Sequence, residues 1–127
     1  MQRSDAVQFA QSWIDAWNRR DIEDVLGWYV EDLIFTSPTA LEVTGHPTVV
    51  GKVALRAYWQ KALTQITDLH FTLDRVLWDA STHELGVVYT RVVNGVTKRA
   101  VETFFFNSSG GVTTTDVFVG PLPAPLE

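Results

Sequence analysis

Length, composition and charge narrow the class of protein before any pattern is considered. The chain has 127 residues, 46% hydrophobic and 20% charged, which is typical of one globular domain with a substantial core. The ten Lys and Arg are scattered and the formal net charge is −5, so we expect no nucleic-acid partner. The chain has no cysteine, which excludes disulfides, thiolate metal sites and cysteine nucleophiles.

The sequence also shows no signal for targeting or for membrane insertion. No stretch reaches the roughly 18 apolar residues that a membrane span needs, and the first residues lack the apolar run of a signal peptide. We therefore expect a cytoplasmic protein without a membrane partner, built as a single domain over residues 1–127.

The amino-terminal part of the chain is predicted to form an αα-hairpin. From Ser4 to Asn18 the apolar residues recur at helical spacing, and Ser4 is the expected cap. Asp21 is then expected to cap a short second helix, whose first turn carries acidic residues. Two helices joined by so tight a turn pack against each other.

One strand and one more helix are predicted before the sheet. Residues 33–37 form a short strand that Pro38 ends, and residues 38–50 are expected to be a loop because proline and glycine recur in them. A third helix is predicted over residues 53–66, where apolar residues return to helical spacing.

The second half of the chain is rich in Val, Thr, Phe and Tyr, with turn residues at intervals. The strands predicted from this pattern cover residues 70–78, 84–93, 96–106 and 112–119. Residues 119–127 are expected to be a proline-rich tail. Only the helices can cover one face of this meander. The predicted fold class is therefore α+β, with three helices packed in the concave face of a strongly curved antiparallel sheet, a cone-shaped barrel with a central pocket.

The Asn94-Gly95 pair predicts a register for the central hairpin. A two-residue loop there pairs Val93 with Val96 and Val87 with Glu102. Because side chains alternate, one face carries Leu85, Val87, Tyr89, Arg91, Lys98, Ala100, Glu102, Phe104 and Phe106. The other face carries Val88, Thr90, Val92, Thr97, Arg99, Val101, Thr103 and Phe105.

Glu102 is the candidate catalytic residue. If its face looks inward, it is a carboxyl group among apolar neighbours. Burial raises a carboxyl pKa, and such a group serves as a general acid or base, or as a neutral hydrogen-bond donor. The alternative is that this face is solvated here, or that Glu102 pairs with Arg91.

Aromatic residues are abundant, and large rings often line ligand cavities. The side chains expected to line a pocket for a small apolar molecule are Trp13, Trp17, Phe35, Trp59, Tyr89 and Phe104. The alternative is that each ring simply fills the core. The three histidines, His46, His70 and His83, stand apart from one another, so we expect no metal site.

Three segments together resemble a known family. Residues 13–21 (WIDAWNRRD), 28–32 (WYVED) and 51–59 (GKVALRAYW) are similar to those of SnoaL-like proteins in the nuclear transport factor 2-like, or ketosteroid isomerase-like, superfamily. The resemblance extends over residues 5–119 and implies a conical pocket with Glu102 facing it. The superfamily contains isomerases, polyketide cyclases, epoxide hydrolases, dehydratases and non-catalytic binding domains, so it implies a cavity rather than one reaction.

The resemblance also implies positions for the chemistry of a ketosteroid isomerase. Trp13 stands where that pattern has a tyrosine, Ser37 where it has an aspartate base, and Glu102 where it has a protonated aspartic acid. Only Glu102 keeps its chemistry, because an indole has no acidic hydroxyl and a lone serine is no base. Classical ketosteroid isomerisation is therefore not expected, and Ser37 joins the expected pocket lining.

Two main classes of function stay open. The first is an isomerase, cyclase or hydratase without metal or cofactor, in which Glu102 is the acid or base and Tyr89 and Trp13 orient the substrate. The second is a non-catalytic ligand-binding or accessory protein. A protein-interaction scaffold is a third class that no residue distinguishes. The outer sheet face is apolar, with Val101 and Phe105 among its residues, so a homodimer through this face is expected, as in relatives.

Overall fold

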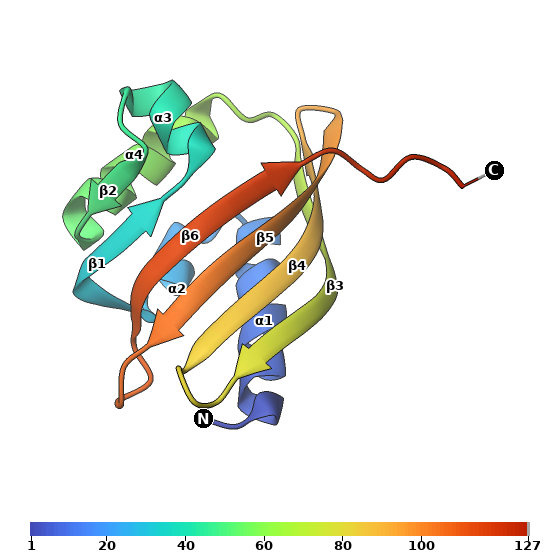
Figure 1. Ribbon diagram of the computed structural model, residues 1–127. Helices are drawn as coiled ribbons and strands as arrows, with labels where there is room; N and C mark the ends of the chain where they lie inside the picture. The colour runs from blue at the N-terminus through green and yellow to red at the C-terminus, as the bar shows by residue number, and fades with distance from the viewer. Residues whose placement is uncertain (127) are drawn as a thin grey trace.

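The computed structural model describes residues 1–126 and consists of four helices and a six-stranded sheet (Figure 1). The helices are α1 (Arg3–Asn18), α2 (Ile22–Leu26), α3 (Pro38–Thr44) and α4 (Lys52–Thr64). The strands are β1 (Tyr29–Thr36), β2 (Thr48–Val50), β3 (Leu69–Asp79), β4 (Glu84–Val93), β5 (Val96–Phe106) and β6 (Val112–Gly120). Their order across the sheet is β2-β1-β6-β5-β4-β3. The predicted α+β class with helices against a curved sheet is confirmed.

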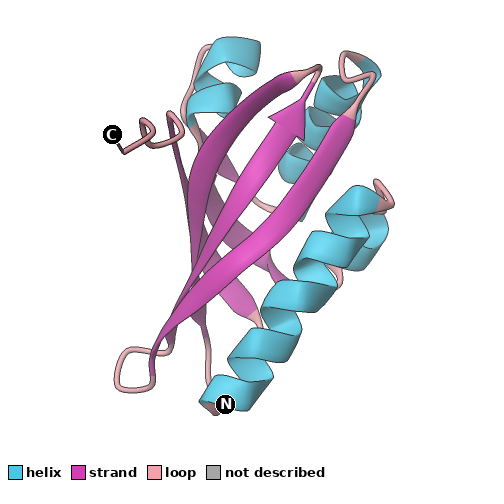
Figure 2. Ribbon diagram, turned by 90° about the vertical axis from the view of Figure 1, so that its right-hand side faces the viewer, coloured by secondary structure: helices cyan, strands magenta, loops and turns pink. Residues whose placement is uncertain are grey.

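Helix α1 lies along the concave side of the sheet (Figure 2). Its apolar stripe is buried there, in Ala6, Phe9, Ala10, Trp13, Ile14, Ala16 and Trp17. The predicted cap is wrong: Gln2 precedes the helix and donates its backbone N–H to the Asp5 carboxylate at 2.8 Å, so Ser4 lies inside the first turn. Asp21 caps α2 as predicted, accepting a hydrogen bond from the Asp24 backbone N–H at 3.0 Å.

The β4–β5 hairpin has the predicted register. Asn94 and Gly95 have φ angles of 51° and 79°, as a mirror-image hairpin turn requires, and Val93 pairs with Val96 and Val87 with Glu102. The face predicted to look inward is buried over the middle of the hairpin. Its buried members, with exposed fractions between 0% and 7%, are Leu85, Val87, Tyr89, Ala100, Glu102, Phe104 and Phe106.

The loop predicted over residues 38–50 is wrong, because this segment contains α3 and β2. Ser37 Oγ accepts the Thr39 backbone N–H at 3.2 Å, and Pro38 occupies the first helical turn, where its missing N–H costs nothing. Gly45, with φ of 83°, ends α3 in a left-handed conformation. Proline and glycine thus mark the two ends of a helix here rather than a loop.

The sheet is larger than the predicted four-stranded meander and is not wholly antiparallel. Strand β1 begins at Tyr29, four residues before its predicted start, and pairs parallel with β6 and antiparallel with β2. Between Leu73 and Arg75 the β3–β4 register shifts, so Asp74 is an extra residue. A bulge of this kind increases local twist, which bends the sheet around the helices.

The remaining elements follow their predicted positions closely. Helix α4 spans Lys52–Thr64 rather than residues 53–66, and β6 continues to Gly120, so the proline-rich tail begins at Pro121. Glu127, the last residue of that tail, lies outside the described residues. Within residues 1–126, no helix is long and apolar enough to cross a membrane.

Candidate functional site

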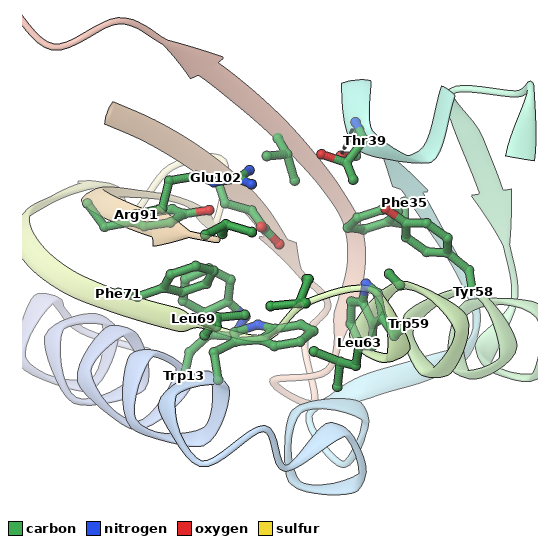
Figure 3. A pocket seen from close by; sticks show the side chains of 17 residues that line it. Trp13, Phe35, Thr39, Tyr58, Trp59, Leu63, Leu69, Phe71, Arg91 and Glu102 are labelled. Atoms are coloured by element: carbon green, nitrogen blue, oxygen red, sulfur yellow. Dashed lines mark hydrogen bonds between the residues drawn. The ribbon is translucent and has the colours of Figure 1, made fainter. Parts of the chain in front are cut away.

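A cavity of about 100 Å³ lies between the helices and the concave face of the sheet (Figure 3). Its walls come from α1, α4 and the inner faces of β1, β3, β4, β5 and β6. The lining side chains are Trp13, Trp17, Phe35, Ser37, Thr39, Tyr58, Trp59, Ala62, Leu63, Ile66, Leu69, Phe71, Tyr89, Arg91, Val93, Glu102 and Val117. A cavity of this size has room for about one small ring.

The walls of the cavity are aromatic rings in edge-to-face contact. The rings of Trp17 and Trp59 are 4.8 Å apart at 84°, and those of Trp13 and Tyr89 are 5.4 Å apart at 73°. Phe71 closes the wall beside Tyr89 at 4.9 Å. Such contacts hold each ring in one orientation, so the cavity has a defined shape before any ligand enters.

Glu102 places a carboxyl group in this apolar wall. Its side chain extends from β5 into the cavity (Figure 3), and only 4% of the residue is exposed. Its Oε2 accepts a hydrogen bond from the Thr115 hydroxyl on β6 at 2.9 Å. Burial raises the pKa of Glu102 to about 8; the Thr115 hydrogen bond lowers it and the charge of Asp116 raises it. The carboxyl is therefore mostly protonated at neutral pH.

No cation neutralises Glu102. Among residues 1–126, no Lys, Arg or His nitrogen lies within 4.0 Å of its carboxyl oxygens, so the alternative pairing with Arg91 is not made. A buried carboxyl without a cation is kept neutral by its surroundings, and a neutral carboxyl can both donate and accept a hydrogen bond.

Two other buried polar groups lie near this carboxyl. Trp13 Nε1 and the Tyr29 hydroxyl have no hydrogen-bond partner within residues 1–126. Burial, and then the nearby Glu102, raise the pKa of Tyr29 well above 10, so its hydroxyl stays protonated. Trp13 lines the cavity, whereas Tyr29 is not among the lining residues. The indole of Trp13 lowers the pKa of Tyr29, so its N–H lies beside the Tyr29 hydroxyl, although no well-formed hydrogen bond joins the two groups. Buried donors are normally paired, so this N–H is incompletely satisfied.

The structure brings most of the sequence-predicted site residues together. Those in the cavity lining are Trp13, Trp17, Phe35, Ser37, Trp59, Tyr89 and Glu102. Phe104 is outside the lining: it is fully buried in the core, with its ring 5.2 Å from Phe9 and 5.3 Å from Trp13. Ser37 uses its hydroxyl to cap α3, which accounts for its burial without any chemical role.

The sequence did not predict Phe71, which lines the cavity, or Thr115, which holds Glu102. Phe71 alternates with Leu69 and Leu73 along β3, and that pattern alone would have placed it on the inner face. Thr115 carries no such signal, because its contact with Glu102 depends on the β5–β6 register, which the sequence does not specify. Among residues 1–126, no group of three His, Asp or Glu side chains is placed to hold a metal ion.

Known proteins with similar structures and a sequence-family model identify the family of this protein. No curated protein matches the chain in sequence. A SnoaL-like protein of unknown function from Burkholderia thailandensis has a similar structure, with a TM-score of 0.84 and 29% identity over 94% of this chain and 97% of that one. An NTF2-like protein of unknown function from Burkholderia pseudomallei is also similar (TM-score 0.77, 23% identity, 91% and 90% covered).

A more distant structural neighbour is an enzyme. The epoxide hydrolase/cyclase-like enzyme SalBIII, described for pyran ring formation in the polyether salinomycin, has a TM-score of 0.74 at 14% identity, with 94% of this chain and 93% of that one covered. That likeness shows a shared fold. The SnoaL-like domain model matches residues 10–117, most of the length of the chain, and this protein therefore belongs to the SnoaL-like family.

Proposed function

We propose that this protein is an enzyme of the isomerase, cyclase or hydratase type, in which Glu102 exchanges a proton with a small, largely apolar substrate. The observation that carries the proposal is the carboxyl itself: it is buried in an aromatic cavity, is held by Thr115, and has no cation beside it within residues 1–126. Burying an ionisable group without a charge partner is costly for stability, and such groups concentrate at sites of proton transfer.

The chemistry follows from the protonation state of Glu102. In its neutral form the carboxyl can donate a proton to a substrate oxygen, and the ionised form that results can take a proton back in a later step. A pKa near 8 allows both forms to be reached close to neutral pH. Trp13 lines the same cavity, and its indole N–H, which makes no well-formed bond to the neighbouring Tyr29 hydroxyl, is the candidate for a second hydrogen bond to the substrate oxygen.

The size of the cavity limits the substrate. A volume of about 100 Å³ takes one small ring, or one end of a longer molecule. Ser37 and Trp13 supply neither a base nor an acidic phenol, so the proposal excludes the mechanism of a classical ketosteroid isomerase. Two reaction types need only one proton-exchanging carboxyl. In enolisation of a ketone, the ionised form removes the α-proton and returns a proton from the solvent; in opening of an epoxide, the neutral form protonates the ring oxygen while water attacks the carbon and then gives its proton to the carboxylate.

The test uses two one-ring probes, cyclohexanone and cyclohexene oxide. Deuterium exchange at the α-carbon of the ketone and opening of the epoxide are followed by NMR with the wild-type protein, Glu102→Gln and Glu84→Gln. Glu84 is a matched control because it lies on the neighbouring strand and, by alternation, on the opposite face. We expect the wild-type protein and Glu84→Gln to accelerate one of these reactions, and Glu102→Gln to lose that acceleration by about 100-fold or more.

Equal rates for the wild-type protein and Glu102→Gln with both probes would favour the second class, a non-catalytic ligand-binding protein. The loss of the tyrosine and aspartate of the isomerase pattern, at Trp13 and Ser37, favours that class. Retention of a buried, cation-free carboxyl favours the enzyme, since a cavity that only binds apolar molecules gains nothing from it.

We also propose that two copies of the chain pair through the outer sheet face. Leu77 and Phe118 are 56% and 59% exposed on this side, and the partly buried Val101 lies between them. Sedimentation should show a dimer that Phe118→Ser dissociates, whereas Val53→Ser, at a 78% exposed site on α4, leaves it intact. A monomer at all concentrations would overturn this part of the proposal.

A further inference from the structure

The mouth of the cavity carries a positive charge, that of Arg91, whereas its interior is apolar apart from Glu102. Arg91 lies on β4, on the same sheet face as Glu102, and is half-buried. It lines the cavity and also a second, outer groove, together with Thr39 and Val93. The two spaces therefore adjoin at these residues, of which Figure 3 labels Arg91 and Thr39.

The guanidinium of Arg91 has no acceptor within residues 1–126, since it makes neither an ion pair nor a side-chain hydrogen bond there. A guanidinium carries five N–H donors in a planar fork that suits a carboxylate. Glu102 does not neutralise it, because no ion pair joins them and Glu102 is mostly uncharged at neutral pH. Arg91 thus presents an unpaired positive charge beside an apolar cavity.

The outer groove adds a second cation and one anion. Lys98 is the cross-strand neighbour of Arg91 in the β4–β5 hairpin and also lines the groove. Glu42, on α3, lines the same groove from the other side and is exposed to solvent. The formal charge of the groove is therefore positive by one unit from these three residues. This balance favours a ligand with one negative charge over a neutral or cationic one.

We propose that the ligand of this protein is amphipathic, with an apolar ring in the cavity and a carboxylate outside it, bound by Arg91 in the outer groove. The proposal rests on the proposed function only in using the same cavity for the ring. It adds the substrate class: a small cyclic or aromatic acid whose carboxylate is separated from the ring by a short chain. Arg91 is then the binding residue for the acid, and Lys98 strengthens its field.

The experiment compares acids with their amides. The probes are phenylacetate, 3-phenylpropionate and 4-phenylbutyrate, which lengthen the chain by one carbon at a time, and the three corresponding amides. Binding to the wild-type protein is followed by tryptophan fluorescence, because Trp13, Trp17 and Trp59 line the cavity. We expect at least one acid to bind about tenfold more tightly than its amide, the effect of a charge-assisted hydrogen-bond pair.

Variants at the groove separate the role of Arg91 from general charge. In Arg91→Gln the acid should bind no better than its amide, while the affinity for the amide stays unchanged, which also shows that the cavity is folded. Lys98→Gln should weaken the acid about twofold, and Arg99→Gln, on the outer face of β5, should have no effect. Salt should weaken binding of the acid and not of the amide.

Three results overturn the proposal: acids and amides of equal affinity in the wild-type protein, an acid preference that survives Arg91→Gln, and failure of every acid to bind at millimolar concentration. An acid preference that depends on Glu42 rather than Arg91, tested with Glu42→Gln, would also count against it. None of these results changes the rates compared in wild-type protein and Glu102→Gln, so this proposal and the proposed function can fail separately.

Discussion

The two faces of the central sheet place the same kinds of side chain in opposite environments. Phe104 on β5 points inward and is fully buried, whereas Phe118 on the neighbouring β6 is 59% exposed. The carboxyl of Glu102 is enclosed in the aromatic cavity, whereas Asp116, close to it on β6, lies outside the cavity lining. The face to which a residue belongs, rather than its type, therefore decides whether it contributes packing, chemistry or an interaction surface.

Truncation of one phenylalanine on each face should give the largest difference. Phe104→Ala removes a fully buried ring that contacts Phe9 and Trp13, so we expect a loss of about 3–5 kcal/mol in the free energy of unfolding. Phe118→Ala should cost less than about 0.5 kcal/mol in the monomer. Urea unfolding, at a concentration where sedimentation shows only monomer, measures both values. Equal losses would contradict the assignment of the two faces.

The pH dependence of stability tests the inner face next. The pKa of Glu102 is about 8 in the folded protein and should be near its ordinary 4.5 when unfolded. Between these values the folded state binds more protons, so its stability falls as pH rises, by at most about 1.4 kcal/mol per pH unit. Below pH 4.5 and above pH 8 this contribution is level.

The measurement is the unfolding free energy of the wild-type protein minus that of Glu102→Gln, from pH 4 to 9. Subtraction removes the groups that both proteins share, such as Glu23 and Asp79, whose pKa values are lowered by hydrogen bonds. A flat difference would place the Glu102 carboxyl in water and remove the basis for proton transfer.

The inner face could be predicted in advance because it depends on local signals. Asn94-Gly95 determines a two-residue turn, and strict alternation then places Glu102 on the same face as Tyr89 and Arg91. That this face looks inward was implied by the family resemblance and not by alternation. The family resemblance rests on residues of α1, the start of β1 and α4, which are short, contiguous segments. These parts needed no knowledge of contacts between distant segments.

The parts that sequence reasoning missed depend on pairing between distant segments. The parallel pairing of β1 with β6, the edge strand β2 and the contact of Thr115 with Glu102 have no local signature. The loop predicted over residues 38–50 rests on the recurrence of proline and glycine there, although Ser37-Pro38 is also a typical helix start. Alternation correctly places Phe104 on the inner face, but it does not show whether a residue on that face lines the cavity or lies in the core beside it, as Phe104 does.

Thr115→Val should have a smaller effect on stability and should also change the pKa of Glu102. It removes the hydroxyl that donates to Oε2 at 2.9 Å, so the pKa of Glu102 should rise above its wild-type value and stability should fall by about 1 kcal/mol. The matched control is Thr114→Val, one residue earlier and on the opposite face. Carbon-detected NMR of the Glu102 carboxyl measures the shift. A lowered pKa would mean that Thr115 does not stabilise the ionised form.

Asp116→Asn should have the smallest effect and tests whether the two faces are electrically independent. Asp116 lies next to Thr115 and Val117, which both face inward, so its own side chain is directed away from the cavity. Its negative charge nevertheless raises the pKa of Glu102, because a single sheet layer between two carboxyl groups does not screen them as water does. Removal of the charge should lower the pKa of Glu102 by less than Thr115→Val raises it. No change would show that the sheet isolates its faces electrostatically as completely as it separates their packing, and that burial and the Thr115 hydrogen bond alone set the proton affinity of Glu102.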